Sequence, residues 1–207
     1  FIIRLFSALI LTFSYIELAY SKTTKIIIFG DSLIAGYGLV VEDNFVNQLN
    51  LKTIENKIND VTLFNSGVSG ETSTGLLNRY KWVLEDNYDG VIILIGANDA
   101  LRGIDPSLTS QNIEKILSYL KEKQIPTMLI GMKAPNNLGE IYVNEFNAIY
   151  PKLSKKYNTA YYPFFLKDVA LKPSLNQRDM IHPNKKGVKI IVNNFFPSFL
   201  EFYESLK

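Results

Sequence analysis

Cysteine is absent from this 207-residue chain, and histidine occurs only once, at position 182. The lack of cysteine excludes disulfides, thiolate metal sites and thiol nucleophiles. It fits a reduced compartment and an exported protein without disulfides equally well. Because imidazole is the side chain that most readily exchanges protons near neutral pH, any chemistry of that kind in this chain must use His182.

An excess of charge of one sign is also missing. The chain has 22 basic and 20 acidic residues, a net charge of +2. This balance gives no basic stripe of the kind that binds nucleic acid, so no nucleic-acid partner is expected. The composition, 47% hydrophobic and 20% charged, is typical of a globular protein. The length suits one domain with a sizeable core.

The most apolar run is too short for a comfortable membrane span. Arg4 precedes a largely apolar stretch at 5–16, about a dozen residues, whereas a span needs about 20. Small residues at 19 and 21 have the spacing that a signal peptidase recognises. We therefore expect residues 1–21 to be a signal peptide, and residues 22–207 to be an exported, periplasmic domain without a stable membrane span. The alternatives are an N-terminal helix packed on the domain and a retained anchor.

Apolar runs alternate with helical patterns along the rest of the chain. The runs at 26–29, 61–65, 91–95, 126–132 and 160–163 predict five strands. The helical patterns between and after them cover 42–59, 76–84, 105–120, 142–157 and 184–207. This alternation predicts an α/β fold of parallel β–α–β units, with helices on both faces of the sheet.

Two prolines and one tryptophan lead to further expectations. Pro151 leaves open a kink or a break in its helix, and Pro197 predicts an interruption of the last helix. Trp82 lies beside the apolar stripe of its helix and is expected to pack rather than to contact a ligand.

Three short polar loops follow the first three predicted strands, at 30–32, 69–70 and 96–99. Ligands of open parallel sheets bind outside the carboxyl ends of the strands, so these loops should border one cleft. A fourth segment, 179–183, follows the fifth strand. Taken singly, each loop is explained as a turn or a helix cap. Together they supply a serine, a histidine, an aspartate and candidate oxyanion donors, which are the parts needed for acyl transfer.

The spacing of Asp179 and His182 has a physical rationale. Three residues apart on one turn, the carboxylate can reach the Nδ1–H of the imidazole. Nε2 is then free to take the proton of Ser32. Pro183 biases His182 toward an extended backbone, so the histidine should lie just before the last helix and not within it.

Four blocks in this order resemble those of the SGNH (GDSL) hydrolase family. They are Gly30-Asp31-Ser32-Leu33, Ser69-Gly70-Glu71-Thr72, Gly96-Ala97-Asn98-Asp99 and Asp179-x-x-His182. Within that family, the chain is most similar to the bacterial multifunctional thioesterase I / lysophospholipase / arylesterase group. Segments 98–103, 149–153 and 163–165 also resemble that group, and the resemblance runs from about residue 24 to the end. It implies a three-layer α/β/α, flavodoxin-like fold with a five-stranded parallel sheet.

The resemblance also implies the role of each site residue. Ser32 would be the nucleophile, His182 the general base, and Asp179 the group that orients the base. The oxyanion hole would be formed by the N–H groups of Ser32 and Gly70 and by the side-chain amide of Asn98. The implied activity is hydrolysis of small-molecule acyl esters or thioesters, of lysophospholipid, acyl-CoA or aryl ester type, through an acyl-serine. No cofactor and no metal are expected.

Two residues depart from the family pattern. Glu71 stands where relatives usually have Asp, a change that we expect to be harmless. Met180 stands where relatives often have Gly, and it bears on the turn that sets the geometry between Asp179 and His182. Leu101 and Ile104 follow the third block, and we predict either that they border an acyl groove or that they belong to a packed loop.

Other functions remain open from the sequence. A carbohydrate O-acetyl esterase would share the fold and the same residues. An inactive SGNH-like binding module would keep the fold without the chemistry. A phosphate-binding module would need a glycine-rich loop, but Gly30, Gly36 and Gly38 fit neither common phosphate-binding pattern. The sequence predicts no oligomeric state.

Overall fold

A five-stranded parallel sheet forms the centre of the computed structural model, which describes residues 22–207. The strands lie in the order β2 (Val61–Gly67), β1 (Thr24–Gly30), β3 (Gly90–Leu94), β4 (Thr127–Ile130), β5 (Ala160–Tyr162). The predicted α/β fold with five parallel strands is confirmed. The signal-peptide prediction for residues 1–21 lies outside the described residues.

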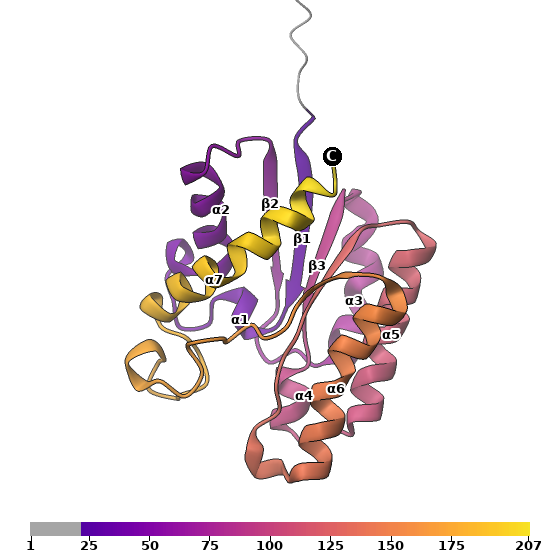
Figure 1. Cartoon of the computed structure of the whole chain (residues 1–207), viewed down its shortest axis with the longest axis vertical. Helices are drawn as coiled ribbons and strands as arrows, with labels where there is room; N and C mark the ends of the chain where they lie inside the picture. The colour runs from indigo at the N-terminus through magenta and orange to yellow at the C-terminus, as the bar shows by residue number, and fades with distance from the viewer. Residues whose placement is uncertain (1–21) are drawn as a thin grey trace, which may run out of the picture.

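Helices cover both faces of the sheet. The α2 helix (Phe45–Glu55) packs against α7 (Lys185–Glu204) on one face. On the other face, α5 (Pro106–Glu122) packs between α3 (Ser73–Val83) and α6 (Glu140–Tyr157), as Figure 1 shows. The shorter elements are α1 (Ser32–Ala35), α4 (Ala97–Leu101) and the 3-10 helices η1 (Val41–Asp43), η2 (Leu84–Asp86), η3 (Asn136–Leu138) and η4 (Pro173–Leu175).

Burial of the central strands explains their unbroken apolar sequences. Residues 26–29 of β1 and all of β3 are buried, because helices cover the sheet on both sides. In the chain from residue 22 onward, none of the helices is both long enough and apolar enough to cross a membrane.

Strand register aligns the loops that carry the sequence blocks. Gly30, the last residue of β1, pairs with Gly67 of β2 and with Leu94 of β3. The N–H of Val68 then donates to the carbonyl oxygen of Gly30 at 2.9 Å. The three loops that follow these strands therefore start at the same edge of the sheet.

The short α1 helix packs closely on this edge, and glycine permits the approach. A Cβ at Gly67 would lie 2.2 Å from the backbone nitrogen of Ala35, and one at Gly30 would lie 2.3 Å from the side chain of Ile34. Any larger residue at either position would push α1 away from the strands. Since α1 begins at Ser32, these glycines set the position of that serine.

The predicted interruption of the last helix at Pro197 is wrong, because α7 runs unbroken from Lys185 to Glu204. Pro197 lies on the exposed side of the helix, as does Asn193, four residues earlier. Water can therefore solvate the Asn193 carbonyl, which receives no hydrogen bond from proline. Pro151 is likewise exposed and inside the continuous α6, so no break occurs there.

The predicted packing of Trp82 is also wrong. Its side chain is 74% exposed on the outer surface of α3. Helical spacing placed it next to the apolar stripe, but the stripe that α3 buries includes Leu76 and Tyr80 and leaves Trp82 outside it.

Candidate active site

Ser32 is the first residue of α1, two residues after the end of β1, which lies between β2 and β3 in the sheet. Asp31 caps this helix by accepting a hydrogen bond from Leu33 N–H at 3.0 Å. Gly36 ends it in a left-handed conformation, and its N–H donates to the carbonyl oxygen of Ser32. A four-residue helix capped at both ends holds Ser32 at the edge where the loops meet.

The structure brings Ser32, His182 and Asp179 together as the sequence predicts. His182 Nε2 lies 2.8 Å from Ser32 Oγ, and His182 Nδ1 lies 2.7 Å from Asp179 Oδ2. The other oxygen, Asp179 Oδ1, accepts hydrogen bonds from the N–H groups of Ile181 and His182, at 2.9 and 3.0 Å. With Nδ1 protonated and facing the carboxylate, Nε2 has a lone pair for the serine hydroxyl.

Hydrogen bonds to Asp179 keep this carboxylate ionised. Burial opposes ionisation, but the hydrogen bonds from the backbone and imidazole of His182 and from the Ile181 N–H lower the pKa of Asp179 to about 2. An ionised carboxylate at this position fixes the imidazole tautomer and stabilises the imidazolium that forms when Nε2 takes a proton.

The histidine loop is fixed to the start of α7. Asn176 and Pro183 form an antiparallel bridge, and the Gln177 N–H donates to the His182 carbonyl at 2.8 Å. The Asn184 side chain caps α7 by accepting from the N–H groups of residues 186 and 187. His182 therefore lies just before the helix, which confirms the prediction made from Pro183.

Gly70 lies in a turn that directly follows β2. The Glu71 N–H donates to the Val68 carbonyl oxygen at 3.1 Å, and Gly70 has φ +79°, which favours glycine strongly over other residues. The Arg102 guanidinium donates to the Gly70 carbonyl oxygen at 2.8 Å. This contact ties the turn to the end of α4.

Asn98 is linked to the serine through Asp31. The Asn98 amide donates to Asp31 Oδ2 at 3.4 Å, a long hydrogen bond. Asp31 is only 1% exposed, and burial raises its pKa to about 6 against the lowering effects of the Leu33 N–H and His182. The three predicted oxyanion donors, on Ser32, Gly70 and Asn98, lie in the segments that follow β1, β2 and β3 at one edge of the sheet. Their catalytic role stays a prediction.

Glu71 forms a buried ion pair that the sequence did not reveal. Arg79 of α3 donates from Nε and Nη2 to the two carboxylate oxygens of Glu71, at 2.6 and 2.7 Å. The same guanidinium binds the hydroxyl and the carbonyl of Ser66 at the end of β2. It also lies over the ring of Phe29. Arg79 therefore joins both ends of the segment that contains Gly70.

A second serine–carboxylate pair lies behind the site. Ser73 donates to Asp99 from its hydroxyl at 2.5 Å and from its backbone N–H at 2.8 Å, and both residues are fully buried. Thr109 also donates to Asp99, and Asn112 donates to the Ser73 hydroxyl. A serine–carboxylate contact alone is compatible with an activated serine. Ser73, however, has no imidazole partner and no exposure, so Ser32 is the stronger candidate nucleophile.

Leu101 and Ile104 lie at the end of α4 and in the loop after it. Leu101 is exposed, whereas Ile104 is half-buried, and its carbonyl oxygen accepts a hydrogen bond from Tyr142 at 2.7 Å. A shallow cavity of about 560 Å³ lies beside them, lined by Gly103, Asp105, Pro106, Glu145 and residues 138–142. Neither Leu101 nor Ile104 lines it, so their role in binding an acyl group stays a prediction.

Tyr37 and Gln177 are further site residues that sequence reasoning missed. The ring of Tyr37 lies against the His182 ring, with centroids 4.7 Å apart, and the Gln177 side chain donates to the Tyr37 carbonyl at 2.7 Å. The position of Tyr37, five residues after Ser32, is the sequence feature that could have indicated its place near the site. Within residues 22–207, no three or more His, Asp or Glu side chains are grouped so that they could hold a metal ion.

The class of protein follows from these features. A Ser–His–Asp arrangement at the carboxyl edge of a parallel sheet, with helices on both faces, defines an α/β serine hydrolase architecture. The model of the GDSL-like Lipase/Acylhydrolase family matches residues 28–190. The chain belongs to this family, the SGNH (GDSL) hydrolases.

Similar proteins support this assignment. An arylesterase of Vibrio mimicus is 34% identical over 186 residues, 89% of this chain and 92% of the relative. The "Thioesterase 1/protease 1/lysophospholipase L1" of Escherichia coli (strain K12) is 36% identical over 169 residues, 81% of this chain and 79% of the relative.

Solved structures of esterases share the fold. The SGNH-hydrolase family esterase AlinE4 is 39% identical, with a TM-score of 0.73 over 87% of this chain and 96% of AlinE4. The psychrotrophic esterase EstA from Pseudoalteromonas sp., inhibited by monoethylphosphonate, is 33% identical, with a TM-score of 0.82 over 87% of this chain and 99% of EstA.

Proposed function

We propose that this chain is a serine acyl hydrolase that cleaves carboxylic esters and thioesters through an acyl-Ser32 intermediate. The observation that carries the proposal is the 2.8 Å contact between Ser32 Oγ and His182 Nε2, with Asp179 2.7 Å from the other imidazole nitrogen. A hydroxyl bonded to an imidazole that a carboxylate orients is the arrangement that activates a serine nucleophile.

The reaction begins with His182. Its Nε2 takes the hydroxyl proton as Ser32 Oγ attacks the carbonyl carbon, and Asp179 stabilises the imidazolium. The negative charge on the former carbonyl oxygen is bound by the N–H groups of Ser32 and Gly70 and by the Asn98 amide. Collapse of this intermediate breaks the bond to the leaving oxygen or sulfur, which takes the proton from Nε2. Water, which gives a proton to His182 Nε2, then attacks the acyl-serine. The bond between the acyl carbon and Ser32 Oγ breaks, Oγ takes the proton from Nε2, and the acid leaves.

The relatives support esters and thioesters as the substrate class. One is named an arylesterase, and another is named for thioesterase and lysophospholipase activities. We propose that acyl chains run past Leu101 and Ile104, on the side of Ser32 where α4 ends. A series of p-nitrophenyl esters of increasing acyl length, compared with acyl-CoA thioesters, tests this preference.

The Ser32→Ala variant tests the mechanism. Without the hydroxyl no acyl-enzyme can form, so hydrolysis of p-nitrophenyl acyl esters should fall to the level of the uncatalysed reaction. Ser73→Ala, which removes the second serine–carboxylate pair, should keep activity in the fraction that remains folded. Near-normal activity of Ser32→Ala would refute the mechanism. Activity on carbohydrate O-acetyl esters alone would overturn the proposed substrate class.

A further inference from the structure

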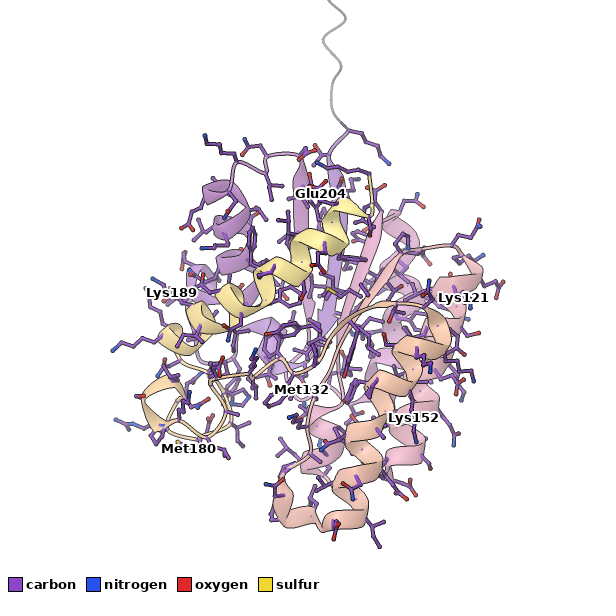
Figure 2. All side chains as sticks on the ribbon, viewed as in Figure 1. Lys121, Met132, Lys152, Met180, Lys189 and Glu204 are labelled. Carbon is purple, nitrogen blue, oxygen red and sulfur yellow. The ribbon has the colours of Figure 1, made fainter. Side chains whose placement is uncertain are left out.

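Met180 occupies a backbone conformation that favours glycine. Its φ is +62°, in the left-handed region where a side chain strains the chain. The turn is closed by the Met180 N–H, which donates to the Gln177 carbonyl oxygen at 3.0 Å. A residue other than glycine keeps this conformation where the surrounding structure holds it, and such positions are found at active sites. Figure 2 shows Met180 on the loop that precedes α7.

Three residues with exposed apolar side chains either precede His182 directly in the chain or contact its ring. Met180 is 38% exposed and Ile181 is 44% exposed, and both directly precede the histidine. Tyr37 is 54% exposed, with its ring against that of His182. We call Tyr37, Met180 and Ile181 the histidine-side patch. Exposed apolar side chains that gather at one place mark a binding surface more often than scattered ones do.

Hydrogen bonds hold the two segments of this patch together. The Gln177 amide nitrogen donates to the carbonyl oxygens of Tyr37, at 2.7 Å, and of Pro183, at 3.1 Å. Farther along the chain from Tyr37 and from Ile181, Lys185 Nζ forms an ion pair with Asp43 Oδ1 at 3.0 Å, which also joins the two segments. The patch is therefore a fixed part of the fold, contributed by the loop after α1 and the loop before α7.

The direction of proton transfer places the leaving group next to this patch. His182 Nε2 delivers the proton to the leaving oxygen when the bond from the carbonyl carbon breaks. The leaving group must therefore lie on the histidine side of Ser32. An alcohol or thiol of apolar character would cover Met180 and Ile181 there, whereas a polar one would gain nothing from them.

We propose that Tyr37, Met180 and Ile181 form a leaving-group subsite that favours esters of aromatic and other apolar alcohols. This inference rests on the proposed acyl-serine mechanism. In this proposal the Met180 side chain contributes to selectivity between leaving groups. Glycine at that position would relieve the backbone strain but would remove the apolar surface.

Two acetate esters that share an acyl group separate leaving-group binding from the other steps. Both 2-naphthyl acetate and 2-hydroxyethyl acetate give the same acetyl-Ser32, so only acylation depends on the leaving group. Met180→Gly should lower kcat/KM for 2-naphthyl acetate about 5- to 10-fold, and change that for 2-hydroxyethyl acetate less than about 2-fold. The rate of deacetylation should stay unchanged. Met180→Leu, which keeps the apolar surface, should retain most of the preference.

Trp82→Ser is the matched control, because it removes an exposed aromatic side chain that lies on α3 and outside the site. It should change neither ester. Two results would overturn the leaving-group subsite, provided that mass spectrometry still finds acetyl-Ser32. One is an equal loss of kcat/KM for both esters in Met180→Gly. The other is a loss of kcat/KM in Met180→Leu as large as that in Met180→Gly. If wild-type protein forms no acetyl-Ser32 at all, the acyl-serine mechanism fails, and the subsite fails with it.

Discussion

Arg79 holds the carboxylate of Glu71 with two hydrogen bonds, of 2.6 and 2.7 Å, from one guanidinium group. Glu71 is buried, and Arg79 is mostly buried. The pair spans the turn that contains Gly70 and the helix α3 that follows it. The glutamate at position 71 is thus held by two hydrogen bonds from one side chain of α3.

Loss of Arg79 should destabilise the fold. Arg79→Met would leave the Glu71 carboxylate buried without its partner, and we expect the free energy of unfolding to fall by about 3–5 kcal/mol. Urea denaturation at neutral pH measures this difference. The double variant with Glu71→Gln should recover part of the loss, because the buried charge is then gone. A single variant as stable as the wild type would show that the pair does not stabilise the turn.

Asn98 should affect turnover more than binding. Asn98→Ala removes one of the three proposed oxyanion donors, and the loss of one such donor typically lowers kcat by about 10²–10³. Steady-state kinetics with a p-nitrophenyl ester measure the change, with KM expected to stay nearly constant. A change in KM alone would place Asn98 in ground-state binding and outside the oxyanion hole.

Asp31 should make stability depend on pH in an unusual direction. The pKa of Asp31 is about 6 in the folded protein and 3.8 without the effect of the fold. Between these two pH values the folded state therefore binds more of this proton than the unfolded state does. The free energy of unfolding should therefore fall by about 3 kcal/mol as pH rises from about 4 to about 6. Asp179 acts oppositely at lower pH. Its pKa is lowered to about 2, so its stabilisation is present above about pH 4 and is lost as pH falls toward 2.

Asp31→Asn isolates the first of these effects. The amide oxygen can still accept the hydrogen bond from the Leu33 N–H, but the side chain at position 31 no longer ionises. The free energy of unfolding should therefore change little between pH 4 and 6. Thermal unfolding across this range measures it, with Asp86→Asn as a control at an exposed carboxylate. Activity should also decrease, because the new amide nitrogen faces the Asn98 amide in place of an acceptor. An unchanged pH profile would mean that burial of Asp31 does not perturb its ionisation.

Met180→Gly should stabilise the protein while it reduces selectivity. A residue other than glycine loses about 1–2 kcal/mol of stability in a left-handed conformation, and glycine removes this cost. Glycine also makes the unfolded chain more flexible, which offsets roughly half of that gain. We expect the free energy of unfolding to rise by up to about 1 kcal/mol in urea denaturation. A clear loss of stability would show that the Met180 side chain packs favourably in the native loop.

The sequence predicts the sheet and the convergence of the site for one physical reason. Apolar runs identify parallel strands, and parallel strands bring the loops at their carboxyl ends to the same edge. Ser32, Gly70 and Asn98 therefore lie at the same edge of the sheet although they are far apart in the chain. The position of His182 just before the last helix follows from the proline after it.

Three features of the structure could not be predicted from local sequence patterns. Such patterns do not show which side of a helix faces the core. The continuity of α7 through Pro197 depends on solvent reaching one helix face. Trp82 is exposed because the buried stripe of α3 passes beside it. The pair between Glu71 and Arg79 joins a turn to a helix eight residues on, a spacing that belongs to no regular element.

The most direct test of the acyl-serine mechanism is the site at which a fluorophosphonate probe becomes attached. EstA, a relative of known structure, is inhibited by monoethylphosphonate, whose phosphorus centre is tetrahedral like the proposed intermediate. Intact mass and peptide mapping of the labelled protein should show one adduct, on Ser32, and none in His182→Ala. An adduct on Ser73, or no adduct in active wild-type protein, would contradict the proposed role of Ser32.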